Sequence, residues 1–184
     1  MQTTFTPAQL LDPHIQEADK ILRACVHCGF CTATCPTYVL LGDERDSPRG
    51  RIYLIKEMLE GGGAATSSVV THVDRCLSCL SCMTTCPSGV NYMHLVDHAR
   101  VHIANTFTRP LHERLMRAVL ALVLPRPRLF RLALSGARLA RPLAAILPAP
   151  LKAMLDLLPN RPPAPSTFES PQVVRAEGPR RKRV

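Results

Sequence analysis

Eight cysteines in two copies of one motif constrain this chain more than any other feature of its sequence. The first copy, C-x2-C-x2-C-x3-C-P, runs from Cys25 to Pro36, and the second runs with the same spacing from Cys76 to Pro87. All eight cysteines of the chain lie within these two copies. This motif is typical of bacterial [4Fe–4S] binding. The repeat therefore predicts two [4Fe–4S] clusters and the transfer of single electrons.

The spacing also predicts which cysteines share a cluster. In two-cluster ferredoxins the fourth cysteine of each motif ligates the cluster of the other motif. We therefore expect the first cluster on Cys25, Cys28, Cys31 and Cys86. We expect the second cluster on Cys76, Cys79, Cys82 and Cys35. Gly29 lies inside the first loop, where the missing Cβ lets backbone N–H groups approach the cluster sulfurs.

Two other uses of the cysteines are less consistent with the sequence. Four disulfides would suit a small secreted domain, but residues 1–20 have neither the basic start nor the apolar stretch of a secretory signal. Structural zinc usually takes cysteines in C-x2-C pairs, whereas here a third cysteine follows at the same step and a fourth precedes proline. The motif thus favours iron–sulfur clusters over both alternatives.

The composition suggests that bound clusters support the fold. The chain has no tryptophan, 4% aromatic residues and 17 prolines, so its organic core is expected to be thin. Binding of a metal group at a site that the unfolded chain lacks contributes free energy of folding. We therefore expect the chain without clusters to be largely unfolded.

Helical periodicity predicts an all-α fold, namely an α-helical ferredoxin with two clusters, over residues 1–108. Helices are expected at 14–24, 38–41, 91–105 and from a Ser47–Pro48 start to the Gly61–Gly63 run, with a polar loop at 42–46. A short helix capped by Ser67 or Ser68 is expected to run to Leu77. The 40 residues between the motifs show almost no strand alternation, and the compact β-rich ferredoxin uses a shorter connection, so the sequence favours the all-helical ferredoxin.

The second part of the chain differs sharply in charge. Residues 1–108 hold 8 basic and 10 acidic residues, a net charge of −2, whereas residues 109–184 hold 15 and 4, a net charge of +11. Amphipathic basic helices are expected over 109–158, at 109–124, 127–140 and 143–158. Residues 159–184 read as a Pro-rich basic linker or disordered tail. No apolar run reaches the roughly 20 residues of a membrane span.

Several other residues suggest functions that the sequence leaves open. Arg49 and Arg51 begin a helix near the first cluster and could pair with the nearby acidic residues or dock a partner. His94, His98 and His102 recur every four residues; this pattern fits a partly exposed helix face better than a metal site. No catalytic constellation and no dinucleotide fingerprint occurs, so substrate chemistry is expected on another chain.

The sequence segments that flank the cysteines are more specific for one protein family than the cysteine motifs are. Residues 21–38 (ILRACVHCGFCTATCPTY), 48–56 (PRGRIYLIK), 74–77 (DRCL) and 85–90 (TCPSGV) resemble the iron–sulfur subunit of glycolate oxidase, also called glycolate dehydrogenase. The similarity is close over residues 21–90 and looser through residues 125–127. Members of this family continue with two cysteine-rich C-terminal domains, and this chain stops at Val184, where that region would begin.

The resemblance implies an electron-transfer subunit without a substrate site of its own. Its partners would be FAD-binding subunits that oxidise glycolate to glyoxylate, and its clusters would relay electrons toward a membrane acceptor such as quinone. The implied location is cytoplasmic, with peripheral contact to the inner membrane left open. Two alternatives remain: the equivalent subunit of a lactate or glycerol-3-phosphate dehydrogenase, and an iron–sulfur regulator or nucleic-acid-binding protein. No groove-reading motif accompanies the basic tail, so we expect no nucleic acid partner.

Overall fold

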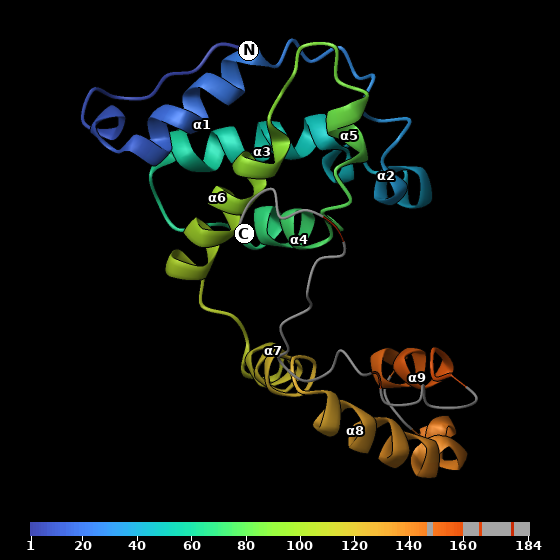
Figure 1. Cartoon of the computed structure of the whole chain (residues 1–184). Coiled ribbons are helices and arrows are strands. Elements are labelled where there is room, and N and C mark those ends of the chain that lie inside the picture. The colour runs from blue at the N-terminus through green and yellow to red at the C-terminus, as the bar shows by residue number, and fades with distance from the viewer. Residues whose placement is uncertain (147–148, 160–165, 167–177, 179–184) are drawn as a thin grey trace. The chain divides into compact units, whose positions relative to one another are not determined.

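Helices make up all the regular structure of the described residues. The computed structural model describes residues 1–146, 149–159, 166 and 178 (Figure 1). Within these ranges it has no strand, which confirms the all-α prediction. The elements are η1 (Gln9–Leu11), α1 (Pro13–Ala24), α2 (Pro36–Leu41), η2 (Glu44–Asp46), α3 (Pro48–Gly61), α4 (Ser67–Asp74), α5 (Ser81–Thr84), α6 (Tyr92–Thr106), α7 (Leu111–Val123), α8 (Pro127–Ala140), η3 (Arg141–Ile146) and α9 (Ala149–Asp156).

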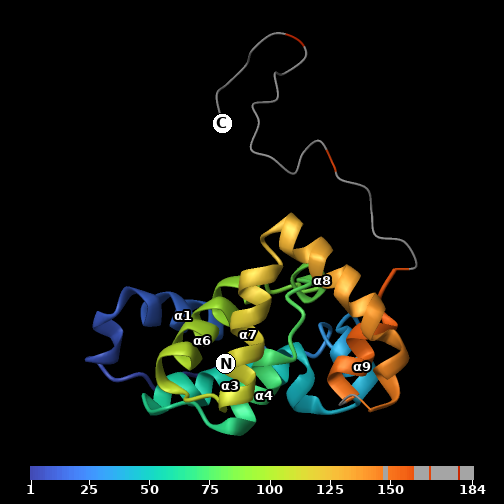
Figure 2. The same cartoon turned by 90° about the horizontal axis from the view of Figure 1, so that it is seen from below.

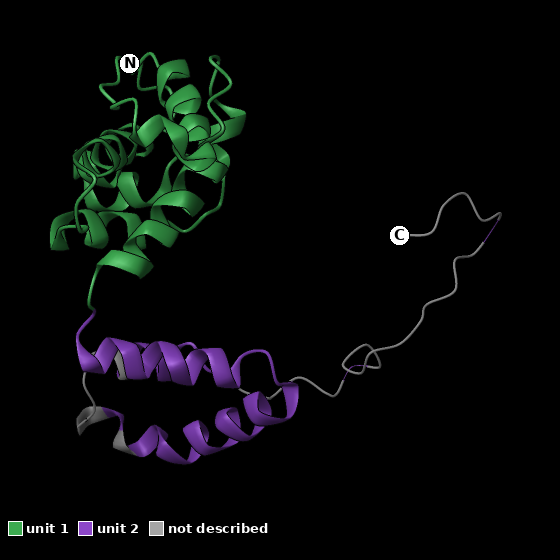
Figure 3. Cartoon of the chain, turned by 90° about the vertical axis from the view of Figure 1, so that its left-hand side faces the viewer, with its two compact units in different colours: residues 1–108 green, residues 109–184 purple. Residues whose placement is uncertain are grey.

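The chain divides into two compact units, residues 1–108 and 109–184 (Figure 3). Unit 1 holds both cysteine motifs and the helices from η1 to α6. Its core lies where α1, α3, α4 and α6 contact one another, as Figures 1 and 2 show. The side chains with almost no exposure there are mainly aliphatic: Leu22, Ile52, Ile55, Leu59, Val73, Leu95, Val96, Ala99 and Ile103.

Local signals in the sequence explain where α3 begins and ends. The Ser47 hydroxyl accepts a hydrogen bond from the Gly50 N–H at 2.9 Å, and Pro48 occupies the first turn. Gly62 ends the helix in the left-handed conformation with φ +61°. Gly50 also has a packing role, because a Cβ there would lie 2.0 Å from the backbone oxygen of Glu44. Glycine thus lets α3 pack directly against η2.

Two boundaries of unit 1 differ from the sequence-based expectations. Helix α4 is capped by the Thr66 hydroxyl, which accepts from the Val69 N–H, and it ends at Asp74 rather than continuing to Leu77. The expected polar loop at 42–46 contains the 3-10 turn η2, capped by Asp43. Its last residue, Asp46, is fully buried. The rest of the segment is exposed or half-buried, so Asp46 alone turns into the interior of unit 1, where its carboxylate has charged partners.

Unit 2 consists of helices α7, α8 and α9 with η3. Helix α8 has the predicted bounds, whereas the helix expected at 143–158 is divided into η3 and α9. Several large apolar side chains of α7 are exposed, among them Leu111 at 78% and Leu115 at 65%. No described helix is both long enough and apolar enough to cross a membrane. The basic tail expected over 159–184 lies almost wholly outside the described residues.

Candidate iron–sulfur cluster site

The eight cysteines line two neighbouring cavities of unit 1. Cys25, Cys28, Cys31 and Cys86 line the first, and Cys82 also borders it. Cys35, Cys76, Cys79 and Cys82 line the second. We call these groups of four the Cys25 site and the Cys35 site. Each group consists of three cysteines of one motif and the last cysteine of the other; that each group of four holds its own cluster stays a prediction from the spacing.

The two cavities share part of their lining. Pro48, Cys82 and Tyr92 border both of them, so a single layer of side chains separates the sites. Two groups bound in these cavities would therefore be close neighbours.

The cysteine loops share an unusual backbone course. In the first loop His27 and Gly29 have positive φ angles, 59° and 86°; in the second loop Ser78 and Leu80 have 51° and 59°. His27 and Ser78 each precede the second cysteine of their motif, and Gly29 and Leu80 each follow it. Left-handed conformations are uncommon outside glycine. Their recurrence at matching positions shows that both motifs fold into the same loop.

The spread of the sulfur atoms argues against single metal ions. Four sulfurs around a tetrahedral zinc would lie about 3.8 Å apart, since each Zn–S bond is about 2.3 Å. In the described part of the chain no three cysteine sulfurs gather within 4.8 Å of one another. The one group of three potential ligand atoms that does is Asp43, Asp46 and His72, whose carboxylates are already paired with arginines. The donor set thus fits a group larger than one ion.

Burial and mutual repulsion keep the central thiols protonated when no metal is bound. Burial, together with the neighbouring cysteines, raises the pKa of Cys82 to about 12. Burial likewise raises the pKa of Cys31. A coordinating thiol is deprotonated outright, so binding of a positively charged iron group would relieve this repulsion. Metal binding at these thiols would therefore release protons.

A buried arginine lies beside the Cys35 site. Arg51, on α3, is 1% exposed. Its Nη1 lies 3.8 Å from the Cys35 sulfur, and its Nη2 donates to the Thr37 hydroxyl at 3.0 Å. Its Nε donates to the His72 carbonyl oxygen at 2.6 Å. The guanidinium is therefore fixed on three sides, with one edge toward a proposed cluster ligand.

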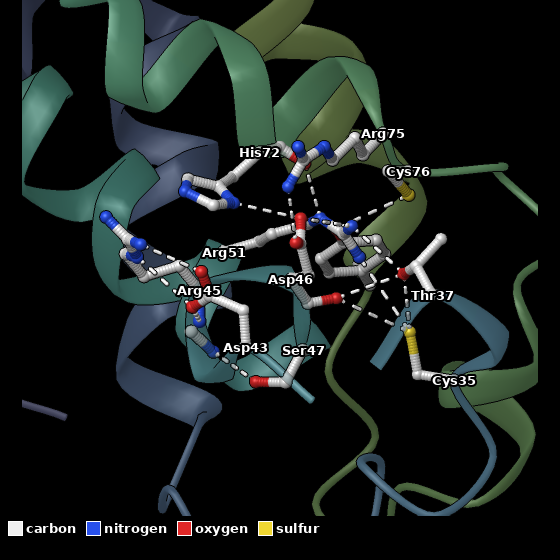
Figure 4. A network of polar contacts seen from close by, with 12 residues as sticks. Cys35, Thr37, Asp43, Arg45, Asp46, Ser47, Arg51, His72, Arg75 and Cys76 are labelled. Atoms are coloured by element: carbon white, nitrogen blue, oxygen red, sulfur yellow. Dashed lines mark hydrogen bonds and ion pairs between the residues drawn. The ribbon is translucent and has the colours of Figure 1, made fainter. Parts of the chain in front are cut away.

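Asp46 completes this buried network, which Figure 4 shows. Its carboxylate accepts hydrogen bonds from Arg51 at 3.3 Å, His72 Nδ1 at 2.9 Å and Arg75 at 2.9 Å. Burial opposes the charged form, but the hydrogen bonds from His72 and Arg75 outweigh it and hold the pKa of Asp46 below its usual value. Two arginines thus share one carboxylate, which leaves positive charge beside Cys35.

The other sulfurs of the Cys35 site also have polar neighbours. The Tyr92 hydroxyl, on the first residue of α6, lies 3.6 Å from the Cys76 sulfur. Hydrogen bonds from the backbone and side chain of Ser81 lower the pKa of Cys79. The Thr37 hydroxyl lies 3.2 Å from the Cys35 sulfur. Sequence reasoning did not identify these contacts, although Tyr92 and Thr37 follow the two Cys-Pro pairs closely.

The two arginines at the start of α3 and two histidines of α6 have partners within the protein. Of the two sequence readings for Arg49 and Arg51, pairing with acidic residues is correct, through Glu44 and Asp46. On α6, His102 Nε2 lies 3.0 Å from the Gly63 carbonyl oxygen, and His98 packs edge-on against His14. These histidines therefore have structural partners, and their atoms form no metal-sized group among the described residues.

Comparisons with known proteins agree with this geometry. Residues 24–90 match the family model described as a 4Fe-4S dicluster domain. Over 155 residues the chain is 52% identical to the glycolate oxidase iron-sulfur subunit of Escherichia coli (strain K12), an alignment covering 84% of this chain and 37% of that protein. It is 34% identical over 176 residues to the probable glycolate oxidase iron-sulfur subunit of Bacillus subtilis (strain 168), covering 89% and 40%. No solved structure matches the chain.

A more distant relative has a different enzyme name. The succinate dehydrogenase iron-sulfur subunit of Paracoccus denitrificans is 27% identical over 96 residues, which cover 48% of this chain and 37% of that protein. The class that fold and site define is an all-helical protein with a 4Fe-4S dicluster domain. Within that class, the chain is a relative of the glycolate oxidase iron-sulfur subunits along most of its length, and it spans about two fifths of theirs.

Proposed function

We propose that this chain is an electron-transfer subunit of a glycolate-oxidising enzyme. It would hold one [4Fe–4S] cluster on Cys25, Cys28, Cys31 and Cys86 and another on Cys35, Cys76, Cys79 and Cys82. The observation that carries the proposal is the pair of adjacent cavities, each lined by cysteines of both motifs. When bound, clusters of this kind accept and release single electrons.

The residues around the cavities have roles that support this function. Cys25, Cys35 and Cys82 are buried, whereas Cys28 and Cys79 are exposed. Each site would thus have one sulfur near the surface, where a partner could exchange electrons, and others in the interior. The shared wall of Pro48, Cys82 and Tyr92 would keep the clusters close enough to exchange electrons with each other.

The enzyme context comes from the relatives rather than from the site. Two relatives are named as iron-sulfur subunits of glycolate oxidase. By extension, a flavin-bearing partner would oxidise glycolate to glyoxylate and reduce the clusters, which would pass the electrons toward a membrane acceptor such as quinone. The same arrangement would serve a lactate or glycerol-3-phosphate dehydrogenase. In either case the protein would work in the cytoplasm, with peripheral contact to the membrane.

The test begins with the chain purified without oxygen. About eight irons and eight sulfides per chain are expected if two cubanes are bound. Flavoproteins that co-purify with the tagged chain are then supplied with glycolate, lactate or glycerol 3-phosphate, and cluster reduction is followed by electron paramagnetic resonance. Reduction by glycolate alone supports the proposal. Zinc without acid-labile sulfide, or clusters that no 2-hydroxy acid reduces, would overturn it.

A further inference from the structure

The two cysteine sites differ in the donors that face their sulfur atoms. In the Cys35 site, side-chain groups of four residues approach three of the sulfurs: Thr37 and Arg51 at Cys35, Tyr92 at Cys76 and Ser81 at Cys79. At the Cys25 site, the backbone of Arg49 donates to Cys31. Among the described residues, no side-chain hydrogen bond reaches a sulfur of that site. The Thr37 hydroxyl donates to the Asp46 carbonyl oxygen at 3.1 Å, so it does not count as a donor to Cys35. The side-chain donors of the Cys35 site are therefore Arg51, Tyr92 and Ser81, and the Cys35 site is the richer of the two in such donors.

The charges near the two sites differ in the same direction. Arg49 lies over Gly29 of the first loop, where a Cβ would be 2.5 Å from its Nη1, but its side chain is 33% exposed and paired with Glu44. Water and this partner weaken its field. Arg51 is buried, and its partner Asp46 is shared with Arg75. Uncompensated positive charge therefore lies beside the Cys35 site.

Donors and cations near a cluster favour its reduced state. Reduction adds one negative charge, which hydrogen bonds to the sulfurs and nearby cations stabilise, so the reduction potential rises. Solvent exposure also tunes the potential. Each site has one exposed cysteine, but the Cys35 site has two buried cysteines whereas the Cys25 site has one. Because deeper burial disfavours added negative charge, the donors and the positive charge at the Cys35 site have to outweigh this difference in burial.

We propose that Arg51, held in place by Asp46 and His72, acts through Cys35 to raise the reduction potential of the cluster in the Cys35 site above that of the cluster in the Cys25 site. Arg51 is a positioning residue, since it contacts a ligand rather than the reacting atoms. This inference rests on the two-cluster function proposed above and adds a direction to it. An electron that enters at the Cys25 site is therefore transferred to the Cys35 site, where the higher reduction potential favours it.

The experiment is a redox titration of the anaerobic, cluster-loaded chain, followed by electron paramagnetic resonance. Cys28→Ser and Cys79→Ser change the same position in the two motifs and assign each signal to its site. The main variant is Arg51→Met combined with Asp46→Asn. It removes the guanidinium that lies 3.8 Å from the Cys35 sulfur together with its carboxylate partner, so the net charge of the network is kept and the variant tests the contact of Arg51 with Cys35. Tyr92→Phe removes one hydroxyl from Cys76. Tyr53→Phe is the matched control, because the Tyr53 ring lies 6.3 Å from that of His27 in the first loop. Within the described residues its hydroxyl makes no hydrogen bond to a sulfur.

In the unmodified chain the Cys35-site signal should appear at the higher potential. The Arg51→Met/Asp46→Asn variant should lower the reduced-to-oxidised ratio of that cluster at least tenfold, about 59 mV for a one-electron couple. Tyr92→Phe should lower it about threefold, as expected for one hydrogen bond. The Cys25-site cluster should stay unchanged in both variants, and Tyr53→Phe should shift neither.

Three results would overturn the inference: equal or reversed potentials in the unmodified chain, equal shifts of both clusters, or no shift in the Arg51 variant. If that variant fails to keep its cluster, the order of potentials and the Tyr92→Phe shift still decide the matter. A chain that binds fewer than two clusters overturns the proposed function as well. Two clusters in the wrong order overturn this inference alone, so the two failures can be distinguished.

Discussion

The two cysteine loops follow the same backbone course in different surroundings. Both turn through left-handed residues on either side of their second cysteine, with Gly29 in one loop and Leu80 at the matching position of the other. Near the first loop, the arginine is partly exposed and paired with Glu44. Near the second, donors arrive from α3 and α6, the helices that follow the two motifs. The motif therefore sets the backbone geometry of each loop, and helices outside the motifs set the environment of the sulfurs.

Removing the iron tests what the two loops have in common, and it should have the largest effect. Both sites are expected to contribute free energy of folding, because their ligands come together only in the folded chain. Without metal, burial raises the pKa values of Cys82 and Cys31 and leaves protonated thiols in the interior. We expect chelation under denaturing conditions, followed by refolding without iron, to abolish most of the helical circular dichroism of residues 1–108. A near-native spectrum would contradict this.

Replacing the last cysteine of either motif tests whether each cluster takes its fourth ligand from the other motif. Cys86→Ala should damage the cluster on Cys25, Cys28 and Cys31, whereas Cys35→Ala should damage the cluster on Cys76, Cys79 and Cys82. Each variant removes one of the four thiolates from a cavity and leaves the other cavity complete. Iron analysis should fall toward half in both, and electron paramagnetic resonance should show which signal is lost. Loss of the cluster within the same motif would refute the crossed assignment.

Removing the acidic partners of Arg51 and Arg49 compares a buried ion pair with a partly exposed one, and the expected effects on stability are of intermediate size. Asp46→Asn leaves a buried guanidinium without its carboxylate and should lower the free energy of unfolding by about 3 kcal/mol. Glu44→Gln, at the partly exposed pair with Arg49, should cost less than about 1 kcal/mol. Urea unfolding of the cluster-loaded chain without oxygen measures both. Equal effects would show that the buried network contributes no more than the surface pair.

The pH dependence of the Asp46 effect has a definite sign. Hydrogen bonds from His72 and Arg75, opposed by burial, hold the pKa of Asp46 below its usual value. Its stabilisation is therefore complete above about pH 4, the ordinary range of an unfolded aspartate, and is lost as the pH falls through the folded-state pKa. The difference between the unmodified chain and Asp46→Asn should thus be the same at pH 7 and pH 5. A difference that already shrinks between these values would contradict the lowered pKa.

The smallest expected effect concerns the left-handed residues of the two loops. Gly29→Ala places a Cβ at φ +86° and 2.5 Å from Arg49 Nη1, so it should destabilise the chain by about 1 kcal/mol or more. Leu80→Gly removes strain of similar size at φ 59° but also some partly buried apolar surface, so its net effect should lie within about 1 kcal/mol of zero. Thermal unfolding of both variants tests this contrast. A larger cost at Leu80 than at Gly29 would mean that side-chain packing outweighs backbone strain.

Local sequence signals predicted much of the fold. Ser47, Pro48 and Gly62 bound α3 as their cap preferences indicate, because these preferences act within a few residues. The predicted start of α4 was wrong because several neighbouring residues can cap a helix. Thr66 precedes Ser67, and its hydroxyl accepts a hydrogen bond from the Val69 N–H, so the cap is Thr66. The helix also ends earlier than expected, at Asp74 with Arg75 as its C-cap, because the loop of the second motif begins there and not after Leu77.

The polar surroundings of the Cys35 site were much harder to predict. Asp46 lies in a short, charged segment whose sequence is typical of a solvent-exposed loop. Its burial depends on two partners far away in the sequence, the buried His72 and the partly exposed Arg75, which follow it by 26 and 29 residues. Arg51 could be assigned to an ion pair from its neighbours in sequence, but its approach to Cys35 depends on how α3 packs against η2. The motif spacing therefore suggested the ligands, while long-range packing determined what surrounds them.

The interlaced lining of the two cavities has a consequence for how the protein is made. When a growing chain has left the ribosome as far as Cys35, it exposes three sulfurs of one cavity and a single sulfur of the other, and Cys86 is still to be synthesised. Neither cavity then has its full set of four. Delivery of iron and sulfide would therefore have to wait for the second motif, and both centres would mature together near the end of synthesis of unit 1.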